Sequence, residues 1–265
     1  MRRSVLTVAT ATSAALLLAG CSSSTSAGSS SNPTASGSSS TVSGTVNVFA
    51  AASLREAFTK LGRQFEAAHP GVDVVFNFGP SSGLATQINQ GAPADVFAAA
   101  STRNMDQVVN TGEADSGSNF ASNAMQIVVP AKNPAGISVL SDLTRPGVKV
   151  ALCQPAVPCG TTAAKVLSNA KLTLTPVTQE VDVKAVLAKV TLGEVDAGIV
   201  YVTDVLTADE KAKGIEIPAE VNASTQYPIA TLTRAPNKVA AQAFTDYVLS
   251  PNGAEVLAAA RFAKP

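Results

Sequence analysis

Histidine and tryptophan are nearly missing from this sequence of 265 residues, which contains one His and no Trp. A single His excludes a His-rich metal site, and any His-dependent catalysis would depend on His69 alone. We expect His69 to end a helix, where a cation complements the helix dipole. An exported hydrolase therefore stays only a remote alternative, and we expect no enzyme, no cofactor and no catalytic residue.

Charged residues are also scarce, at 14% of the chain, and 19 basic residues balance 19 acidic ones. Binding the phosphate backbone of a nucleic acid needs a surplus of Lys and Arg on one face of the protein. A nucleic-acid partner is therefore not expected. Hydrophobic residues make up 46%, which is enough for a core and excludes global disorder.

The first 20 residues have the pattern of a secretory signal. Two Arg precede an uncharged, apolar run that ends in Leu18-Ala19-Gly20-Cys21. The run is short for a membrane span of about 20 residues. Its end resembles the lipobox of bacterial lipoproteins, which implies cleavage before Cys21 and a lipid on its thiol. Without the two Arg of the signal, 17 basic and 19 acidic residues remain, a net charge of −2.

Residues 21–44 are predicted to be a tether. Between residues 22 and 41 there are 11 Ser, 3 Thr and 2 Gly and no charged or aromatic residue, a composition that cannot form a core. We expect a folded body held at the outer face of the cell membrane by the lipid on Cys21, and we expect that body to be a monomer.

Two further cysteines, Cys153 and Cys159, stand six positions apart. An exported compartment is oxidising, so the even number left after lipidation favours a disulfide. The spacing matches neither a Cys-x-x-Cys redox motif nor half of a zinc site. We interpret the pair as a covalent link within a loop.

From residue 45 onward, short runs rich in β-branched residues alternate with amphipathic helical patterns. This alternation predicts an α/β fold with parallel strands and helices on both faces. The expected strands are 45–51, 72–78, 95–100, 125–130, 148–152, 174–179, 197–202 and 226–233. The first expected helix follows Ser53, which we expect to be its N-cap. The other expected helices cover 82–90, a segment from residue 161, 183–192, 237–249 and 253–261. Two units fit the length better than one.

Four of the expected helix starts carry hydroxyl or small residues and no Lys or Arg. They are Ala51-Ala52-Ser53-Leu54, Pro80-Ser81-Ser82-Gly83, Pro158-Cys159-Gly160-Thr161 and Val181-Asp182-Val183. A helix N-terminus offers N–H groups without acceptors and a partial positive charge. Such starts would form an anion site if the fold brought them together, although each one alone is also what an ordinary capped helix looks like.

Several of these segments resemble the periplasmic molybdate-binding proteins of ABC importers. The resemblance rests on Phe49-Ala50-Ala51-Ala52-Ser53-Leu54, Phe78-Gly79-Pro80-Ser81-Ser82-Gly83, Gly91-Ala92-Pro93-Ala94-Asp95-Val96-Phe97 and Gly198-Ile199-Val200-Tyr201. It extends in order over residues 45–265. It implies a two-lobe periplasmic-binding-protein fold of type II, with lobe 1 from 45–123 and 224–265, lobe 2 from 124–223, and the ligand in the cleft.

The resemblance also implies a set of oxyanion-binding residues. Two serine hydroxyls would come from Ser53 and Ser81, with Ser82 as the alternative if the loop register differs by one. The N–H groups of Cys159 and Val183 and the hydroxyl of Tyr201 would complete the set. Cys159 departs from the usual Ala, so a disulfide would lie beside the ligand.

The expected ligand is molybdate or tungstate, delivered to a permease in the cytoplasmic membrane. Both are dianions with no proton to donate, so a site made only of donors suits them. Asp182 is the one acidic residue within the four helix starts, and we expect it to cap its own helix. A binding protein for sulfate or thiosulfate remains the alternative with the same fold, and a surface adhesion module is the alternative of another class.

Overall fold

The computed structural model describes residues 42–265. The predicted signal peptide, Cys21 and nearly all of the predicted tether lie outside the described residues. The segment Ser40–Pro265 forms a compact unit, and its hydrophobic cores are internal to it.

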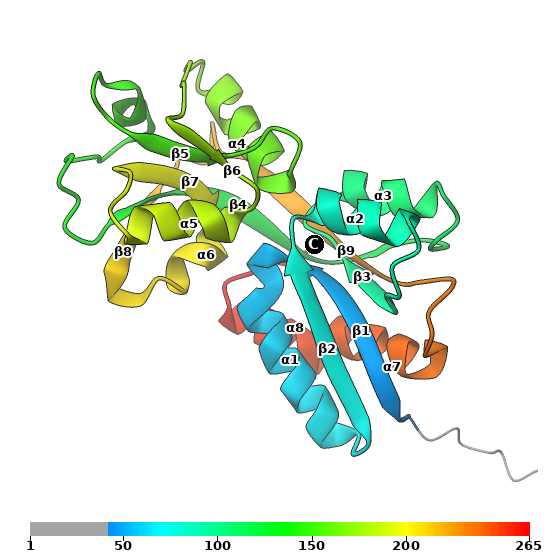
Figure 1. Ribbon diagram of the computed structural model, residues 1–265. Coiled ribbons are helices and arrows are strands. Elements are labelled where there is room, and N and C mark those ends of the chain that lie inside the picture. The colour runs from blue at the N-terminus through cyan, green and yellow to red at the C-terminus, as the bar shows by residue number, and fades with distance from the viewer. Residues whose placement is uncertain (1–41) are drawn as a thin grey trace, which may run out of the picture. The chain divides into compact units, whose positions relative to one another are not determined.

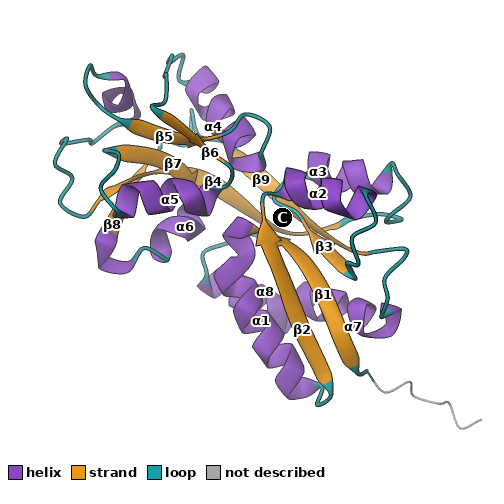
Figure 2. Cartoon of the chain, viewed as in Figure 1, coloured by secondary structure: helices purple, strands orange, loops and turns teal. Residues whose placement is uncertain are grey.

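Strands and helices alternate along the described chain, as the sequence predicts (Figures 1 and 2). The strands are β1 (Gly44–Ala51), β2 (Val72–Gly79), β3 (Val96–Ala98), β4 (Ser118–Pro130), β5 (Val150–Cys153), β6 (Thr178–Glu180), β7 (Ala197–Tyr201), β8 (Ala212–Glu216) and β9 (Ser224–Thr231). The helices are α1 (Arg55–Ala68), α2 (Ser81–Asn89), α3 (Thr102–Val109), α4 (Pro158–Asn169), α5 (Val183–Thr191), α6 (Val202–Leu206), α7 (Lys238–Leu249) and α8 (Pro251–Ala259). Three short 3-10 turns are η1 (Ala52–Leu54), η2 (Leu140–Thr144) and η3 (Asp209–Lys211).

The strands are hydrogen-bonded in the order β2-β1-β3-β9-β4-β7-β5-β6, and β8 pairs with β4. Strands β1, β2 and β3 are parallel, as are β5, β6 and β7. Strands β4, β8 and β9 pair antiparallel with their neighbours. The α/β fold with parallel strands is thus confirmed, with antiparallel strands added between its two parallel groups.

Strand β4 connects the two groups of strands. Its first half, from Ser118 to Ala124, pairs with β9, and its second half, from Met125 to Pro130, pairs with β7 and β8. The sequence predicts only 125–130 as a strand, because 118–123 is rich in Ser and Asn, which disfavour strands. Pairing with β9 overrides that local preference. The prediction also lacks α3, α6 and β8.

The buried hydrophobic residues divide at β4. One cluster contains residues from Met125 to Ile217, and two others contain residues from Val46 to Ala121 and from Tyr227 to Phe262. We use the name lobe 2 for the part around the first cluster and lobe 1 for the part around the other two. The lobe boundaries 123/124 and 223/224 stay a proposal.

Helix α1 illustrates how the sequence pattern becomes packing. Its apolar stripe buries Ala57, Phe58, Leu61 and Phe65 in lobe 1, at the spacing expected of an amphipathic helix. The helix ends at His69, whose ring packs on Phe65 with 4.4 Å between ring centroids. The expectation that His69 ends a helix is confirmed.

Candidate functional site

Ser53 lies in η1, directly after β1, and is buried. The sequence predicts it as the N-cap of the first helix, and this is wrong: the N-cap of α1 is Leu54, without a side-chain cap. The η1 turn separates Ser53 from α1 and leaves its hydroxyl available for another partner. That partner is the hydroxyl of Tyr227, with 2.8 Å between the two oxygens.

Ser81 is the first residue of α2 and is 1% exposed. Its Oγ accepts a hydrogen bond from the N–H of Ala100 at 2.9 Å. A hydroxyl has one proton to donate, and among the described residues no acceptor takes the proton of Ser81. Ser82, the alternative at this position, is only half-buried. The hydroxyl of Ser81 is thus held in place and still able to donate.

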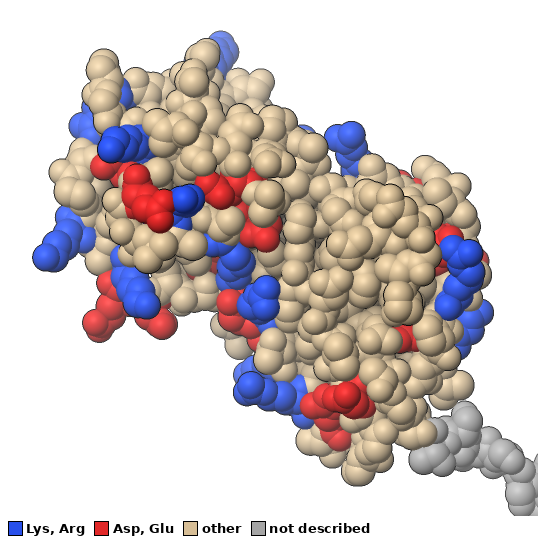
Figure 3. Space-filling model, in the orientation of Figure 1, with Lys and Arg blue, Asp and Glu red and all other residues tan. Residues whose placement is uncertain are grey.

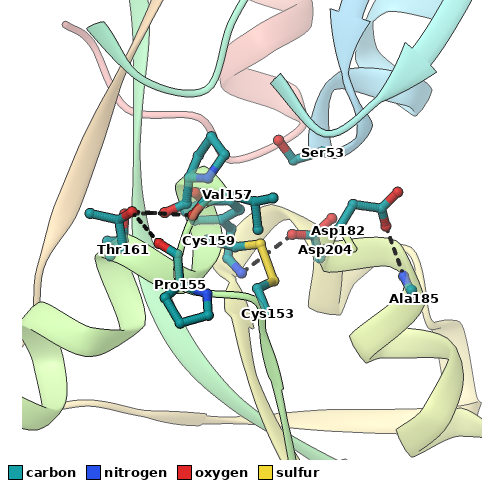
Figure 4. The surroundings of a disulfide bond; sticks show 12 residues. Ser53, Cys153, Pro155, Val157, Cys159, Thr161, Asp182, Ala185 and Asp204 are labelled. Atoms are coloured by element: carbon teal, nitrogen blue, oxygen red, sulfur yellow. Dashed lines mark hydrogen bonds between the residues drawn. A yellow bond between two sulfur atoms is a disulfide. The ribbon is translucent and has the colours of Figure 1, made fainter. Parts of the chain in front are cut away.

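Cys153 and Cys159 form a disulfide with 5.8 Å between their Cα atoms, as the sequence predicts (Figure 4). Cys153 ends β5, and Cys159 lies in the first turn of α4. Because Pro158 begins this helix and has no N–H, Cys159 supplies its first amide hydrogen. The next residue must be small, since a Cβ at Gly160 would stand 1.9 Å from the carbonyl oxygen of Gln154.

Val183 is the first residue of α5, so its N–H has no acceptor within the helix. Asp182 is the N-cap, and its carboxylate accepts from the N–H of Ala185 at 2.9 Å. The expectation that Asp182 caps its own helix is confirmed. The capping bond engages this carboxylate within α5.

Tyr201 ends β7 and is 1% exposed. Its hydroxyl makes no hydrogen bond to any described residue, which is unusual for a buried hydroxyl. Burial raises the pKa of Tyr201, and the nearby hydroxyls of Thr162 and Tyr227 partly offset the rise. At neutral pH this hydroxyl is therefore a protonated donor without an acceptor.

Contacts connect these residues across the two lobes. Tyr227 lies between them: its hydroxyl bonds to Ser53, and its ring centroid is 6.1 Å from that of Tyr201. Helix α5, which begins at Val183, contacts η1 of lobe 1. Figure 4 includes Ser53 in the surroundings of the Cys153–Cys159 disulfide. The structure thus brings Ser53, Tyr201 and the starts of α4 and α5 into one region.

Ser81 connects to the same region less directly. The carbonyl of Ala100 accepts from the hydroxyl of Thr225 at 2.7 Å, and the N–H of Ala100 donates to Ser81. Thr225 lies two residues before Tyr227 on β9. No described contact joins Ser81 to lobe 2.

Two buried polar residues in this region, Asn123 and Tyr227, are not among the predicted site residues. The side-chain amide of Asn123 donates to Thr203 at 2.8 Å and to the Tyr227 hydroxyl at 3.5 Å. When Tyr227 donates to Ser53, the Ser53 proton is left free for a ligand. Tyr227 lies within the predicted strand 226–233, where a polar hydroxyl in a buried strand is the sequence signal that could have identified it. Asn123 lies outside the predicted strands and carries no such signal.

A cavity of about 290 Å³ lies beside these residues. Its wall includes Arg103 from α3, Thr162 and Lys165 from α4, and Gln226 from β9. On the face drawn in Figure 3, positive and negative side chains are interspersed and no large area carries one sign. Arg103 and Lys165 therefore give this cavity a positive wall on a surface of mixed charge.

Among residues 42–265 there is no group of three or more His, Cys, Asp or Glu side chains placed to bind a metal ion. Within the same range, no helix is both long and apolar enough to span a membrane. The arrangement that remains is a set of buried hydrogen-bond donors between two lobes, a site chemistry suited to an anion.

Comparison with known proteins agrees with this chemistry. Residues 46–262 match the family model of the bacterial extracellular solute-binding proteins. The molybdate-binding protein ModA of Mycobacterium tuberculosis is 45% identical over 222 residues, 83% of this chain and 85% of that protein. The chain belongs to the ModA family of extracellular solute-binding proteins. It is a solute-binding protein and not an enzyme.

Two further matches extend the comparison. The periplasmic molybdate-binding protein of Azotobacter vinelandii has a TM-score of 0.73 at 22% identity, covering 83% of this chain and 99% of that one. This confirms the periplasmic-binding-protein fold. The substrate-binding lipoprotein YvgL of Bacillus subtilis is 29% identical over 252 residues, 93% of each chain.

Proposed function

We propose that this protein binds molybdate outside the cytoplasm and delivers it to the permease of an ABC importer. Tungstate is also a dianion, and we propose that it binds at the same site. The proposed ligand set is the hydroxyls of Ser53, Ser81 and Tyr201 and the N–H groups of Cys159 and Val183. The family membership and the name of the mycobacterial relative support molybdate as the cargo.

The observation that carries the proposal is the unpartnered hydroxyl of Tyr201. Leaving a buried polar group without a hydrogen bond costs about 1–3 kcal/mol, and such groups persist where a ligand satisfies them. An anionic oxygen accepts the hydrogen bond that the Tyr201 hydroxyl lacks. The carboxylate of Asp182 is engaged by its helix cap, and that of Asp204 pairs with Lys184.

A calorimetric titration of residues 40–265 with molybdate, tungstate, sulfate and phosphate tests the proposal. We expect binding of molybdate and tungstate and much weaker binding of sulfate, because the larger tetrahedral oxyanions fill a site built for their size. Preference for sulfate would replace molybdate by sulfate as the cargo, and phosphate binding without molybdate binding would reject the assignment.

The Ser53 hydroxyl can be tested separately from the fold. Ser53→Ala removes one donor to a charged ligand, worth about 1.5–3 kcal/mol, so the Kd for molybdate should rise at least tenfold. Ser116→Ala, at an exposed serine of lobe 1, is the control, and it should bind like wild type. An unchanged Kd in Ser53→Ala would remove Ser53 from the ligand set.

We also propose that the chain is exported, cleaved before Cys21 and lipid-anchored at this residue. The name of the Bacillus relative supports a lipoprotein. Mass spectrometry of the membrane fraction should find a lipidated N-terminal Cys21, and Cys21→Ser should release the protein from the membrane. A protein with residues 1–20 still attached, or a membrane-bound Cys21→Ser variant, would contradict the anchor.

A further inference from the structure

Lys184 occupies a special position at the start of α5. It follows Val183, whose N–H belongs to the proposed ligand set, and its side chain is only 19% exposed. Its Nζ lies 2.8 Å from Oε2 of Glu56, on α1 of lobe 1. This ion pair therefore joins the first turn of α5 in lobe 2 to the first turn of α1 in lobe 1.

The same ammonium group has two partners within lobe 2. Nζ lies 3.0 Å from the hydroxyl of Thr207 and 3.2 Å from Oδ1 of Asp204. The contact with Asp204 is an ion pair without hydrogen-bond geometry, since Oδ1 has no hydrogen-bond partner among the described residues. Asp204 is fully buried. Its carboxylate holds the Lys184 ammonium group at the surface of lobe 2, where this group also reaches Glu56.

Asp204 links this ion-pair cluster to the proposed site. Its Oδ2 accepts a hydrogen bond from the backbone N–H of Tyr201 at 3.3 Å. Glu56 lies three residues after Ser53. The cluster thus contacts the backbone of Tyr201, and along the chain its members lie one residue from Val183 and three from Ser53.

We propose that Lys184 is a positioning residue for oxyanion binding, which acts by pairing with Glu56 across the lobes and so stabilises the arrangement in which both lobes contact the ligand. The inference rests on the proposed function. Lys184 does not itself bind the oxyanion, because two carboxylates and a hydroxyl already surround its ammonium group. Its effect on the ligand comes through the relative position of the two helix starts.

Glu56→Gln is the informative variant, because it removes only the Lys184–Glu56 ion pair between the lobes. Replacing Lys184 instead would strand the buried Asp204 carboxylate, at a cost of several kcal/mol that could unfold the protein. Glu56 is 47% exposed, so its neutral amide should be tolerated. A partly exposed pair of this kind predicts a Kd for molybdate about 2- to 5-fold higher than wild type, mainly through faster dissociation.

The sign of the change distinguishes this effect from simple electrostatics. Removing a negative charge near an anion site would, by long-range attraction alone, tighten molybdate binding. The ion-pair proposal predicts weaker binding instead. The difference should shrink in about 0.5–1 M salt, where charges are screened within a few ångströms.

The test is calorimetry and stopped-flow dissociation with molybdate on residues 40–265. Asp73→Asn is the matched control: Asp73 is an exposed acid of β2 in lobe 1, and its loss changes the net charge equally without touching Lys184. Lys184→Arg, which keeps the charge, should bind within about twofold of wild type. In Lys184→Arg, Glu56→Gln should again weaken binding.

Two results separate the failure of this inference from the failure of the proposed function. If wild type binds molybdate and Glu56→Gln binds equally or more tightly, the interlobe role of Lys184 is wrong and the proposed function stands. If wild type binds no oxyanion at all, both are wrong.

Discussion

Tyr201→Phe is the sharpest test of the candidate site, because it should change the stability of the free protein and its affinity in opposite directions. The Tyr201 hydroxyl is buried and has no hydrogen bond to a described residue. Its desolvation is therefore uncompensated in the free protein, at a cost of about 1–3 kcal/mol. Removing it should stabilise the free protein.

The expected gain is about 1 kcal/mol, the lower end of that range, because the lost oxygen leaves a small gap against the rings that pack there. For a chain of this size, 1 kcal/mol raises Tm by about 2–4 °C. With molybdate bound, the variant instead loses a hydrogen bond to a charged acceptor, worth about 1.5–3 kcal/mol. The Kd should then rise by about 10- to 150-fold.

Calorimetric unfolding without ligand and titration with molybdate measure the two effects on the same sample. Tyr227→Phe is the control, because the Tyr227 hydroxyl is paired with Ser53 and Asn123. Its loss should lower the stability of the free protein by about 1 kcal/mol. A Tyr201→Phe variant that is less stable than wild type and binds molybdate with the wild-type Kd would refute the reasoning.

Three further predictions concern the groups around the site. Burial raises the pKa of Asp204 from 3.8 to about 6, so folded protein binds more protons than unfolded chain between these values, and stability should fall as pH rises through them. Each pKa unit is worth about 1.4 kcal/mol. From pH 4 to pH 7 wild type should therefore lose about 2 kcal/mol relative to Asp204→Asn in denaturant titrations, and an equal pH slope in both would contradict this. Replacing both Cys153 and Cys159 by Ala should lower the free energy of unfolding by about 2 kcal/mol while molybdate binding persists, because position 159 contributes through its N–H; calorimetry checks both. Replacing Arg103 and Lys165 by Gln should slow molybdate association at low ionic strength and not in high salt. If the variant and wild type associate at equal stopped-flow rates at low ionic strength, steering by this cavity wall is excluded.

The alternation of strands and helices could be predicted because each element carries its own local pattern. The stripe of α1 and the β-branched run of β1 are examples, since burial of one face suffices to define them. Strand β4 could be predicted only in part. Its first half, Ser118–Ala124, has no local strand signal and exists because β9, about a hundred residues later, supplies the hydrogen bonds. Pairing at that distance cannot be seen in a window of sequence.

The candidate site also has parts that local sequence patterns predict and parts that depend on distant residues. Helix starts are local, so the segments that hold Ser81, Cys159 and Val183 could be recognised from capping and turn residues. Their selection as site residues came from the family resemblance. The partners that orient the side chains are not local: Tyr227 lies 174 residues from Ser53, and Lys184 lies 128 residues from Glu56. Ser53 illustrates the limit. Its place at the end of β1 is as predicted, while its role as N-cap is not, because the partner of its hydroxyl comes from β9.

The near-neutral charge of the chain has a physical counterpart in the site. A Lys or Arg directly on the oxyanion would attract sulfate and phosphate as well, since Coulomb attraction does not distinguish anions of equal charge. Hydroxyl and N–H donors at fixed positions do distinguish them, because a hydrogen bond requires the acceptor oxygen at a set distance. Lys184, which follows Val183 of the proposed ligand set, is already paired with Glu56 and Asp204. Its charge is thus used to hold the two helix starts in position, and discrimination between oxyanions is left to the geometry of the donors.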